Sequence, residues 1–361
     1  MSYRLAALGL ILGSLAIFAT PTLAVDNFRA ACADIAEDNL TPSVSCLQVM
    51  QAYPKPVVTP IRPDRLTLSR FQFWKVVNSG PTLYDTPNGN PIGQMPAGFN
   101  FIHALDATDG WVLNGGGQWM TTEDLKYQPA SEFRGVQLLG GLENPFGWVL
   151  GDLVTSPEPG AKQSLDTGTV KFRYDLVNIF AEVRHTDGWL WYMVGPDQWI
   201  EQRSLAIPKL AEKPADVEAQ RWVGVDLYEQ TLVAYEGETP VYATLIASGL
   251  PGWDTNEGLF DVWARVEHDG MSGATGAPDA YALESVPWVM YFDGGISLHG
   301  TYWHDGFGYR RSHGCVNLSI SDAGYVFNWF KQAQPDENGE IRSQVYVWAS
   351  GEYHGSGPAT K

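Results

Sequence analysis

The chain has 361 residues, which is enough for two or three compact domains. Hydrophobic residues make up 44% of it and aromatic residues 12%, a composition that excludes a disordered or collagen-like polymer. Its 23 Lys and Arg residues are outnumbered by 41 Asp and Glu residues, which gives a formal net charge of −18. Because such a charge repels phosphate backbones and anionic lipid surfaces, we expect no nucleic-acid partner.

The N-terminus has the pattern of an export signal. Arg4 precedes an uncharged apolar stretch, Leu5–Ala19, and small residues then lead to Ala24. We predict a signal peptide over residues 1–24 that is cleaved after Ala24, and hence an exported, extracytoplasmic protein. An uncleaved membrane anchor is the alternative, because the uncharged run continues to Val25 and a membrane span needs about 20 residues.

Residues 25–63 are predicted to form an N-terminal segment that ends in a Pro-rich, extended linker, Tyr53–Pro63. In this segment Cys32 and Cys46 lie close together, and in an oxidising compartment this pair would form a disulfide. Cys315, far downstream, has no partner. A lone thiol in an exported protein is either buried and inert or kept for its reactivity.

The middle of the chain contains an internal repeat. Thr108-Asp109-Gly110-Trp111 and Thr186-Asp187-Gly188-Trp189 match each other, and a Gln-Trp-hydrophobic triplet follows each. The alternating pattern with Asp-Gly turns predicts short antiparallel strands. This pattern resembles the bacterial SH3-like domain, a small β-barrel, over residues 64–130 (repeat 1) and 131–207 (repeat 2). Trp111 and Trp189 either pack within these barrels or bind glycan or peptide of the cell wall.

After a second Pro-containing boundary, residues 217–350 are predicted to form a C-terminal domain. Its first part alternates or runs apolar over 222–227, 230–235 and 241–248, which predicts three antiparallel strands. The helical spacing of apolar residues predicts a helix over Ser321–Gln332, and Val345–Trp348 is predicted as a last strand.

The residues that carry chemistry gather in Ile296–Leu318, which holds Cys315 and three of the seven His residues. A thiol becomes a useful nucleophile when an imidazole takes its proton, and either His299 or His313 could do so. The adjacent Arg310 and Arg311 are the only Lys or Arg residues between Glu267 and Asp322. This placement indicates that their positive charge either lowers the pKa of the thiol or binds a substrate carboxylate. This arrangement predicts cysteine acyl transfer.

The motif Ser312-His313-Gly314-Cys315-Val316-Asn317, preceded by His299-Gly300-Thr301, resembles the signature of the L,D-transpeptidase catalytic domain, the YkuD family. The resemblance covers Gln220–Trp348 and implies a mixed β-sandwich with one or two short helices. By this likeness Cys315 is the nucleophile, His299 the base, and the carbonyl of Gly300 orients the imidazole. The likeness further assigns the acyl site and its oxyanion donors to Ser312, His313, Gly314 and the Cys315 amide, and support of the loop or of substrate to Arg311 and Asn317.

The resemblance implies a reaction on peptidoglycan stem peptides, with no cofactor and no metal. Cys315 would attack the carbonyl before the terminal D-amino acid of a tetrapeptide stem, release that residue, and pass the acyl group to an amine on another stem. With water as the acceptor, the same site would be an L,D-carboxypeptidase. A wall-binding protein with an inactive last domain is a further alternative, although both His299 and Cys315 are present.

Two neighbouring segments are open to more than one interpretation. Many family members carry Thr-Pro-x-Gly-x-Phe before the active-site region, whereas Thr255–Phe260 lacks the Pro. Glu267–Trp288, rich in Gly, is either the mobile flap that covers the donor in this family or an ordinary surface loop.

Two other interpretations concern the motif itself. A zinc site could be built from His299, His304, His313 and Cys315, but no second Cys is nearby. A second alternative makes Cys315 a buried structural residue, which leaves the surrounding His and Arg residues unexplained. His304 is interpreted as an ordinary loop residue rather than a catalytic one.

Overall fold

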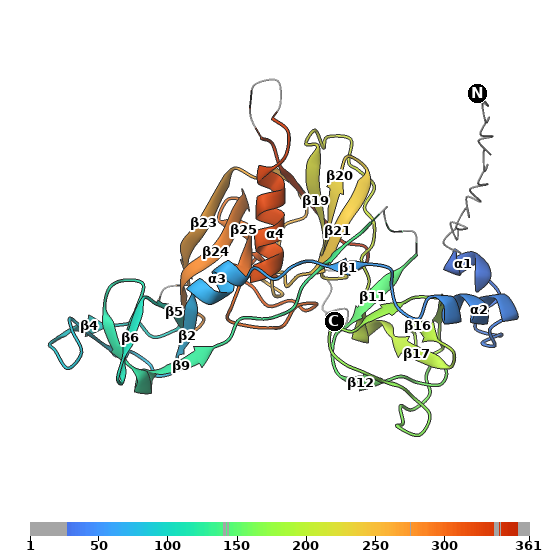
Figure 1. Ribbon diagram of the computed structural model, residues 1–361, viewed down its shortest axis with the longest axis horizontal. Helices are drawn as coiled ribbons and strands as arrows, with labels where there is room; N and C mark the ends of the chain where they lie inside the picture. Colours follow the sequence, from blue (N-terminus) through green and yellow to red (C-terminus); the bar gives the residue numbers. More distant parts are fainter. Residues whose placement is uncertain are drawn as a thin grey trace, which may run out of the picture.

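The computed structural model describes residues 27–139, 142, 144–274, 276–335, 339 and 341–352, and the predicted signal peptide lies outside them. The prediction of a mostly β chain with few helices is confirmed. Figure 1 shows the C-terminal domain, coloured yellow to red, in the middle, with repeat 1 on one side of it and repeat 2 on the other. Among the described residues, no helix has the length and apolar character needed to cross a membrane.

The two repeats are built from strands that pair in the same order. The elements of repeat 1 are α3 Arg65–Arg70, β2 Gln72–Val76, β3 Thr82–Tyr84, β4 Pro91–Gln94, β5 Phe99–Ala104, β6 Asp106–Thr108, β7 Trp111–Leu113, β8 Trp119–Thr121, η1 Thr122–Asp124 and β9 Leu125–Gln128. Those of repeat 2 are β11 Phe146–Val149, β12 Leu153–Val154, β13 Val170–Lys171, β14 Leu176–Asn178, β15 Ala181–Arg184, β16 Leu190–Gly195, β17 Gln198–Glu201, η2 Gln202–Ser204 and β18 Leu205–Ala206. In repeat 1, β2 pairs with β5 and β9, and β7 pairs with β6 and β8. In repeat 2, β11 pairs with β14 and β18, and β16 pairs with β15 and β17.

The C-terminal domain consists of two sheets and one long helix. Its elements are β19 Arg221–Asp226, β20 Thr231–Glu236, β21 Thr239–Leu245, β22 Gly258–Asp261, β23 Ala264–Gly273, β24 Tyr281–Asp293, β25 Ile296–Thr301, β26 Val316–Ser319, α4 Ile320–Lys331 and β27 Gln344–Trp348. The three predicted antiparallel strands are β19, β20 and β21, the predicted helix is α4, and the predicted last strand is β27. These predictions are therefore confirmed.

The core of the C-terminal domain lies where the two sheets and α4 meet. Side chains of β19 and β20, such as Val223 and Leu232, pack with Leu298 of β25 and with Phe330 of α4. The helix begins where the sequence predicts it, because the side chain of Ser319 accepts a hydrogen bond from the Asp322 N–H at 3.1 Å and caps the first turn. The apolar face of α4 thus holds the sandwich together and fixes β25 and β26, the strands that carry the His-Cys motif.

Both sheets extend beyond the C-terminal domain. One has the order β1-β10-β21-β20-β19-β27-β22, in which β1 (Thr59–Pro60) comes from the predicted linker and β10 (Val136–Gln137) from the start of the segment assigned to repeat 2. Phe133, Val136 and Leu138 are buried in the core between this sheet and the rest of repeat 2. The other sheet has the order β26-β25-β24-β5-β2-β9, with β23 also on β24, so it runs from the C-terminal domain into repeat 1.

The N-terminal segment forms two short helices, α1 Phe28–Ala31 and α2 Val44–Ala52, joined by the predicted disulfide between Cys32 and Cys46. These helices lie beside repeat 2, with Phe28 packed against Phe180 (ring centroids 4.8 Å apart). The disulfide therefore stabilises a cap on repeat 2, and the chain then crosses to repeat 1 (Figure 1).

Candidate active site around Cys315

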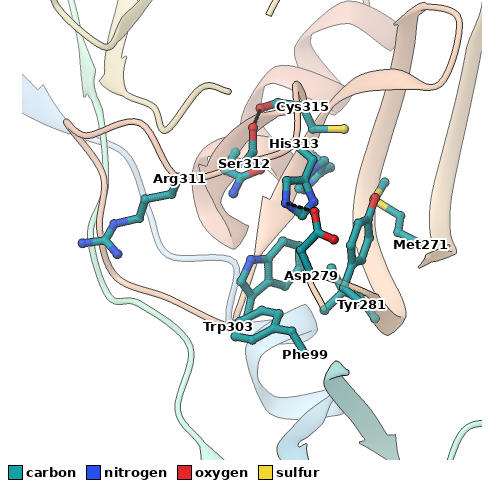
Figure 2. A pocket seen from close by; sticks show the side chains of 12 residues that line it. Phe99, Met271, Asp279, Tyr281, Trp303, Arg311, Ser312, His313 and Cys315 are labelled. Atoms are coloured by element: carbon teal, nitrogen blue, oxygen red, sulfur yellow. Dashed lines mark hydrogen bonds and ion pairs between the residues drawn. The ribbon is translucent and has the colours of Figure 1, made fainter. Parts of the chain in front are cut away.

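Two parallel strands bring the motif residues together. In β25 and β26, Leu298 lies opposite Val316 and His299 opposite Asn317, and Cys315 directly precedes β26. His299 and Cys315 both line one cavity of about 310 Å³. Figure 2 shows this cavity with Cys315 at one side. His299 and Cys315 therefore face the same cavity although they are 16 positions apart in the chain.

The Cys315 thiol is partly exposed to this cavity. Its Sγ lies 3.8 Å from Ser297 Oγ and 3.9 Å from the Gly295 carbonyl oxygen. Desolvation raises the pKa of the Cys315 thiol, an effect that Ser297 partly opposes. The four residues of β26 separate Cys315 from α4.

His299 is buried, and its ring is held in one orientation. Its Nδ1 lies 3.2 Å from the Gly300 carbonyl oxygen and 3.5 Å from Thr301 Oγ1. The Nδ1–H therefore donates to the carbonyl, which leaves the lone pair on Nε2. Burial lowers the pKa of His299 to about 4. The imidazole is neutral near pH 7 and able to accept a proton, although among the described residues no hydrogen bond joins it to Cys315.

The turn before Cys315 is held by its own hydroxyl group. Ser312 Oγ accepts a hydrogen bond from the Gly314 N–H at 3.1 Å and donates to the Cys315 carbonyl oxygen. Gly314 has φ +112°, a conformation that L side chains rarely adopt. Because the Gly314 N–H is already bonded, the implied oxyanion donors reduce to the backbone N–H groups of His313 and Cys315.

Thr255, the first residue of the element that lacks Pro, supports the same turn. Its buried hydroxyl donates to the Gly314 carbonyl oxygen at 2.7 Å and accepts from the Gly249 N–H at 3.1 Å. This contact needs only the Thr. The missing Pro therefore leaves the link between this element and the site intact.

His313 lies at the opening of the cavity rather than beside the sulfur. Its Nε2 is 4.0 Å from Asp279 Oδ2, and its ring is 4.6 Å from Trp253 and 5.3 Å from Tyr281, measured between ring centroids. Figure 2 shows its contact with Asp279. His313 thus lines the cavity with its ring nitrogen directed at a carboxylate of the hairpin.

The two adjacent arginines have different surroundings. Arg310 forms an ion pair with Asp254 and donates to the Gly249 carbonyl, so it ties down the loop. Arg311 is exposed and lines the cavity, and a Cβ on Gly306 would lie 1.8 Å from its Nε. Figure 2 shows the Arg311 guanidinium directed away from Cys315. Arg310, to which the sequence assigned no separate role, is the arginine that supports the loop.

Asn317 is oriented by His304. His304 Nδ1 accepts a hydrogen bond from the Gly306 N–H at 3.0 Å, and burial together with Arg311 lowers the pKa of His304 to about 3. The neutral ring therefore carries its proton on Nε2, 2.9 Å from the Asn317 amide. The Asn317 atom placed there is Nδ2, and its Oδ1 is buried without a hydrogen-bond partner. Since Nε2 must donate, we assign the amide in the flipped orientation, in which Oδ1 accepts from His304. His304 is a buried loop residue that positions Asn317.

The predicted flap is a hairpin and not a loop. β23 and β24 pair from Ala264↔Tyr291 to Gly273↔Tyr281. Met271, Asp279, Tyr281 and Leu283 of this hairpin line the cavity. Residues 264–273 are exposed or partly buried in this strand, and the glycines in its sequence favoured a loop.

The sequence analysis missed the aromatic wall of the cavity. It consists of Phe99, Tyr281 and Trp303, which come from repeat 1, from the hairpin and from the loop after β25. Aromatic residues in short strands are typical of a core, so their types gave no signal. Among the described residues, no group of three or more His, Cys, Asp and Glu side chains has the geometry to hold a metal ion.

The comparisons with known proteins bear on the C-terminal domain. The family described as the L,D-transpeptidase catalytic domain (YkuD) matches residues 220–347. A search of the curated proteins found no match. Among solved structures, the chain is similar to an L,D-transpeptidase of Enterococcus faecium (25% identity, 39% of this chain and 55% of that one, TM-score 0.31). It is also similar to L,D-transpeptidases of Stackebrandtia nassauensis (24%, 41% and 62%, TM-score 0.30) and Mycobacterium smegmatis (18%, 52% and 81%, TM-score 0.32).

The matched region spans only 55% and 62% of the first two of these proteins. The family match, in contrast, begins and ends within the C-terminal domain and includes every residue of the His-Gly and Ser-His-Gly-Cys motifs. Residues 220–347 therefore form an L,D-transpeptidase catalytic domain of the YkuD family, as the motifs predicted.

Proposed function

We propose that the protein cross-links peptidoglycan stem peptides by L,D-transpeptidation through a thioester on Cys315. The observation that carries this proposal is the position of Cys315 and His299 on one cavity within a domain of this family. Arg311 at the same cavity supplies a cation for a carboxylate of the stem.

The chemistry follows from the protonation states. Cys315 Sγ attacks the carbonyl carbon before the terminal D-amino acid while His299 Nε2 takes the thiol proton. The N–H groups of His313 and Cys315 stabilise the negative oxygen of the tetrahedral intermediate. The C–N bond then breaks, the D-amino acid leaves with the proton from His299, and an acyl thioester remains. An amine of a second stem attacks the thioester, its proton passes to His299, and the thiol is restored.

The test is to incubate the purified full-length chain with a disaccharide tetrapeptide and to weigh the products. A dimer that has lost one D-amino acid is the expected product. A tripeptide alone would identify the L,D-carboxypeptidase, in which water attacks the thioester. Unchanged substrate, in an assay where an active L,D-transpeptidase gives dimer, would contradict both activities and favour a wall-binding protein.

We further propose that the protein acts outside the cytoplasm, because the Cys32–Cys46 disulfide is typical of an oxidising compartment. Fractionation of cells that express the full chain tests this: we expect the mature protein in the extracytoplasmic fraction, and recovery from the cytoplasm would contradict it.

We also propose that both repeats are SH3-like barrels that contribute to wall binding. Their common strand pairing supports the fold. The ring of Trp111 packs edge-on against Tyr84 (centroids 5.0 Å apart), and Arg203 covers Trp189 at 4.2 Å. Since both rings have partners within the chain, wall binding through them would use only their outer edges. Co-sedimentation of the protein with insoluble wall sacculi tests it, and an unchanged bound fraction after Trp111→Ala and Trp189→Ala would exclude these two rings.

A further inference from the structure

We infer that repeat 1 is part of the donor site: it supplies Phe99 as a wall of the Cys315 cavity and holds the β23–β24 hairpin that forms the neighbouring wall. The ligand of this wall is an apolar portion of the donor peptide. This inference rests on the proposed function for its substrate, but the attachment of the hairpin to repeat 1 can be measured without it.

The backbone joins repeat 1 to the hairpin directly. β5 of repeat 1 pairs in parallel with the start of β24, with Tyr281 opposite Phe99 and Leu283 opposite Phe101. The Phe99 N–H donates to the Ala280 carbonyl oxygen at 2.7 Å. A Cβ on Gly98 would lie 2.6 Å from that same oxygen, so this close approach requires glycine. The start of β24 therefore has a partner strand on each side, β23 on one and β5 on the other.

A half-buried carboxylate fastens the same junction. Glu284 Oε2, on β24, accepts hydrogen bonds from the backbone N–H groups of His103 at 2.9 Å and Gly115 at 2.8 Å, both in repeat 1. Burial raises the pKa of Glu284, and these two hydrogen bonds oppose the shift. The Glu284 side chain of the hairpin thus accepts hydrogen bonds from two backbone N–H groups of repeat 1.

The side chains at the junction form one core. The Tyr302 ring stacks on Phe73 of repeat 1 with centroids 3.6 Å apart, and its hydroxyl donates to the Glu284 carbonyl oxygen at 2.7 Å. Phe71, Phe73 and Phe101 of repeat 1 are buried together with Leu283, Val286, Val289, Tyr302 and Ile320 of the C-terminal domain. Such a shared core is typical of one folding unit rather than of a tethered module.

Phe99 differs from the other aromatic residues of β5 in its exposure. Phe101 is 2% exposed, whereas Phe99 is 44% exposed and lines the cavity. Figure 2 shows Phe99 and Trp303 close together on the side of the cavity away from Cys315, with Tyr281 beside them. A half-exposed ring at a cavity next to a nucleophile offers apolar surface to whatever enters it. The donor carbonyl at Cys315 would place its adjoining apolar atoms against this wall.

The first test compares Phe99→Ala with Phe172→Ala, a matched control that removes an exposed ring (61% exposed) from repeat 2. We expect Phe99→Ala to raise KM for the tetrapeptide donor about three- to tenfold, the range for losing one aromatic contact, with kcat nearly unchanged. Phe99→Leu should restore part of the affinity, and the rate at which Cys315 reacts with a small alkylating agent should stay at the wild-type value. A KM within twofold of the control would overturn the role of Phe99.

The second test concerns the attachment of the hairpin. Glu284→Ala should speed amide hydrogen exchange in peptides from β23 and β24, while Glu267→Ala, which removes an exposed carboxylate from the same hairpin, should not. If Glu284→Ala does not fold, Glu284→Gln keeps one acceptor oxygen and should give a smaller increase. Equal exchange in the folded Glu284 variant and the Glu267 control would refute the attachment. Wild-type protein without any activity would refute the proposed function instead and leave the exchange result valid.

Discussion

Replacing His299 by Gln tests the assignment of the base most directly. Desolvation raises the pKa of the Cys315 thiol, so the thiol is protonated near pH 7. His299 is neutral there, because burial lowers its pKa to about 4, and it accepts the thiol proton during attack. A positioned base contributes about 10²–10⁴-fold. We therefore expect His299→Gln to lower kcat/KM at least about 100-fold at pH 7.

The pH dependence of the variant separates loss of a base from loss of structure. Without a base, turnover depends on thiol that is already ionised, so the residual rate should rise about tenfold per unit between pH 7 and pH 8. The wild-type rate should change little over this range. His185→Gln, at a half-buried site in repeat 2 that does not line the Cys315 cavity, is the control and should behave as wild type. A His299→Gln variant with wild-type turnover would refute the reasoning, and a large loss in His313→Gln would then identify His313 as the base.

Three further predictions concern the thiol, the disulfide and a buried acid. Cys315→Ala should abolish turnover and leave the thermal unfolding midpoint within a few degrees, because a small side chain facing a cavity contributes little packing; retained turnover would exclude the cysteine mechanism. The double variant Cys32→Ser, Cys46→Ser should lower the free energy of unfolding by about 3 kcal/mol in denaturant titrations, since the disulfide closes a loop of 14 residues. An unchanged free energy would show that packing on repeat 2 holds the two helices without the disulfide. Burial raises the pKa of Asp322 to about 6, so the protonated form favours the fold, and this contribution to stability is lost as pH rises from about 4 to 6. Relative to wild type, Asp322→Asn should therefore stabilise the protein more at pH 8 than at pH 4. An equal difference in the free energy of unfolding at both pH values would contradict this.

Local patterns were enough to predict the C-terminal domain. The strands β19, β20 and β21 follow from alternation, and α4 follows from its apolar spacing. The position of Cys315 and His299 on one cavity also follows, because a motif fixes residue types at a spacing that two parallel strands accommodate. Each of these features depends on residues close together in the chain.

The rest of the site depends on contacts between distant segments. Phe99 reaches the cavity through strand pairing with residues more than 180 positions away, and no pattern in β5 indicates that partner. The partners of Arg310 and Arg311 were equally hidden, since two adjacent arginines differ only in what the fold brings next to them. Desolvation, another product of packing, raises the thiol pKa, whereas the sequence left open whether the arginines lower this pKa or receive a substrate carboxylate.

The internal repeat nevertheless contains a signal for the different roles of its two copies. When the Thr-Asp-Gly-Trp turns are aligned, Gly98 and Phe99 of repeat 1 correspond to Leu176 and Val177 of repeat 2. Val177 is buried in the core of its own repeat, and a leucine in place of Gly98 would collide with the Ala280 carbonyl. Repeat 2 therefore lacks both the close approach and the exposed ring, and it packs instead on the opposite sheet of the C-terminal domain. A glycine followed by a half-exposed aromatic residue, present in one copy and absent from the other, is what a repeat needs to dock on the hairpin and reach the cavity.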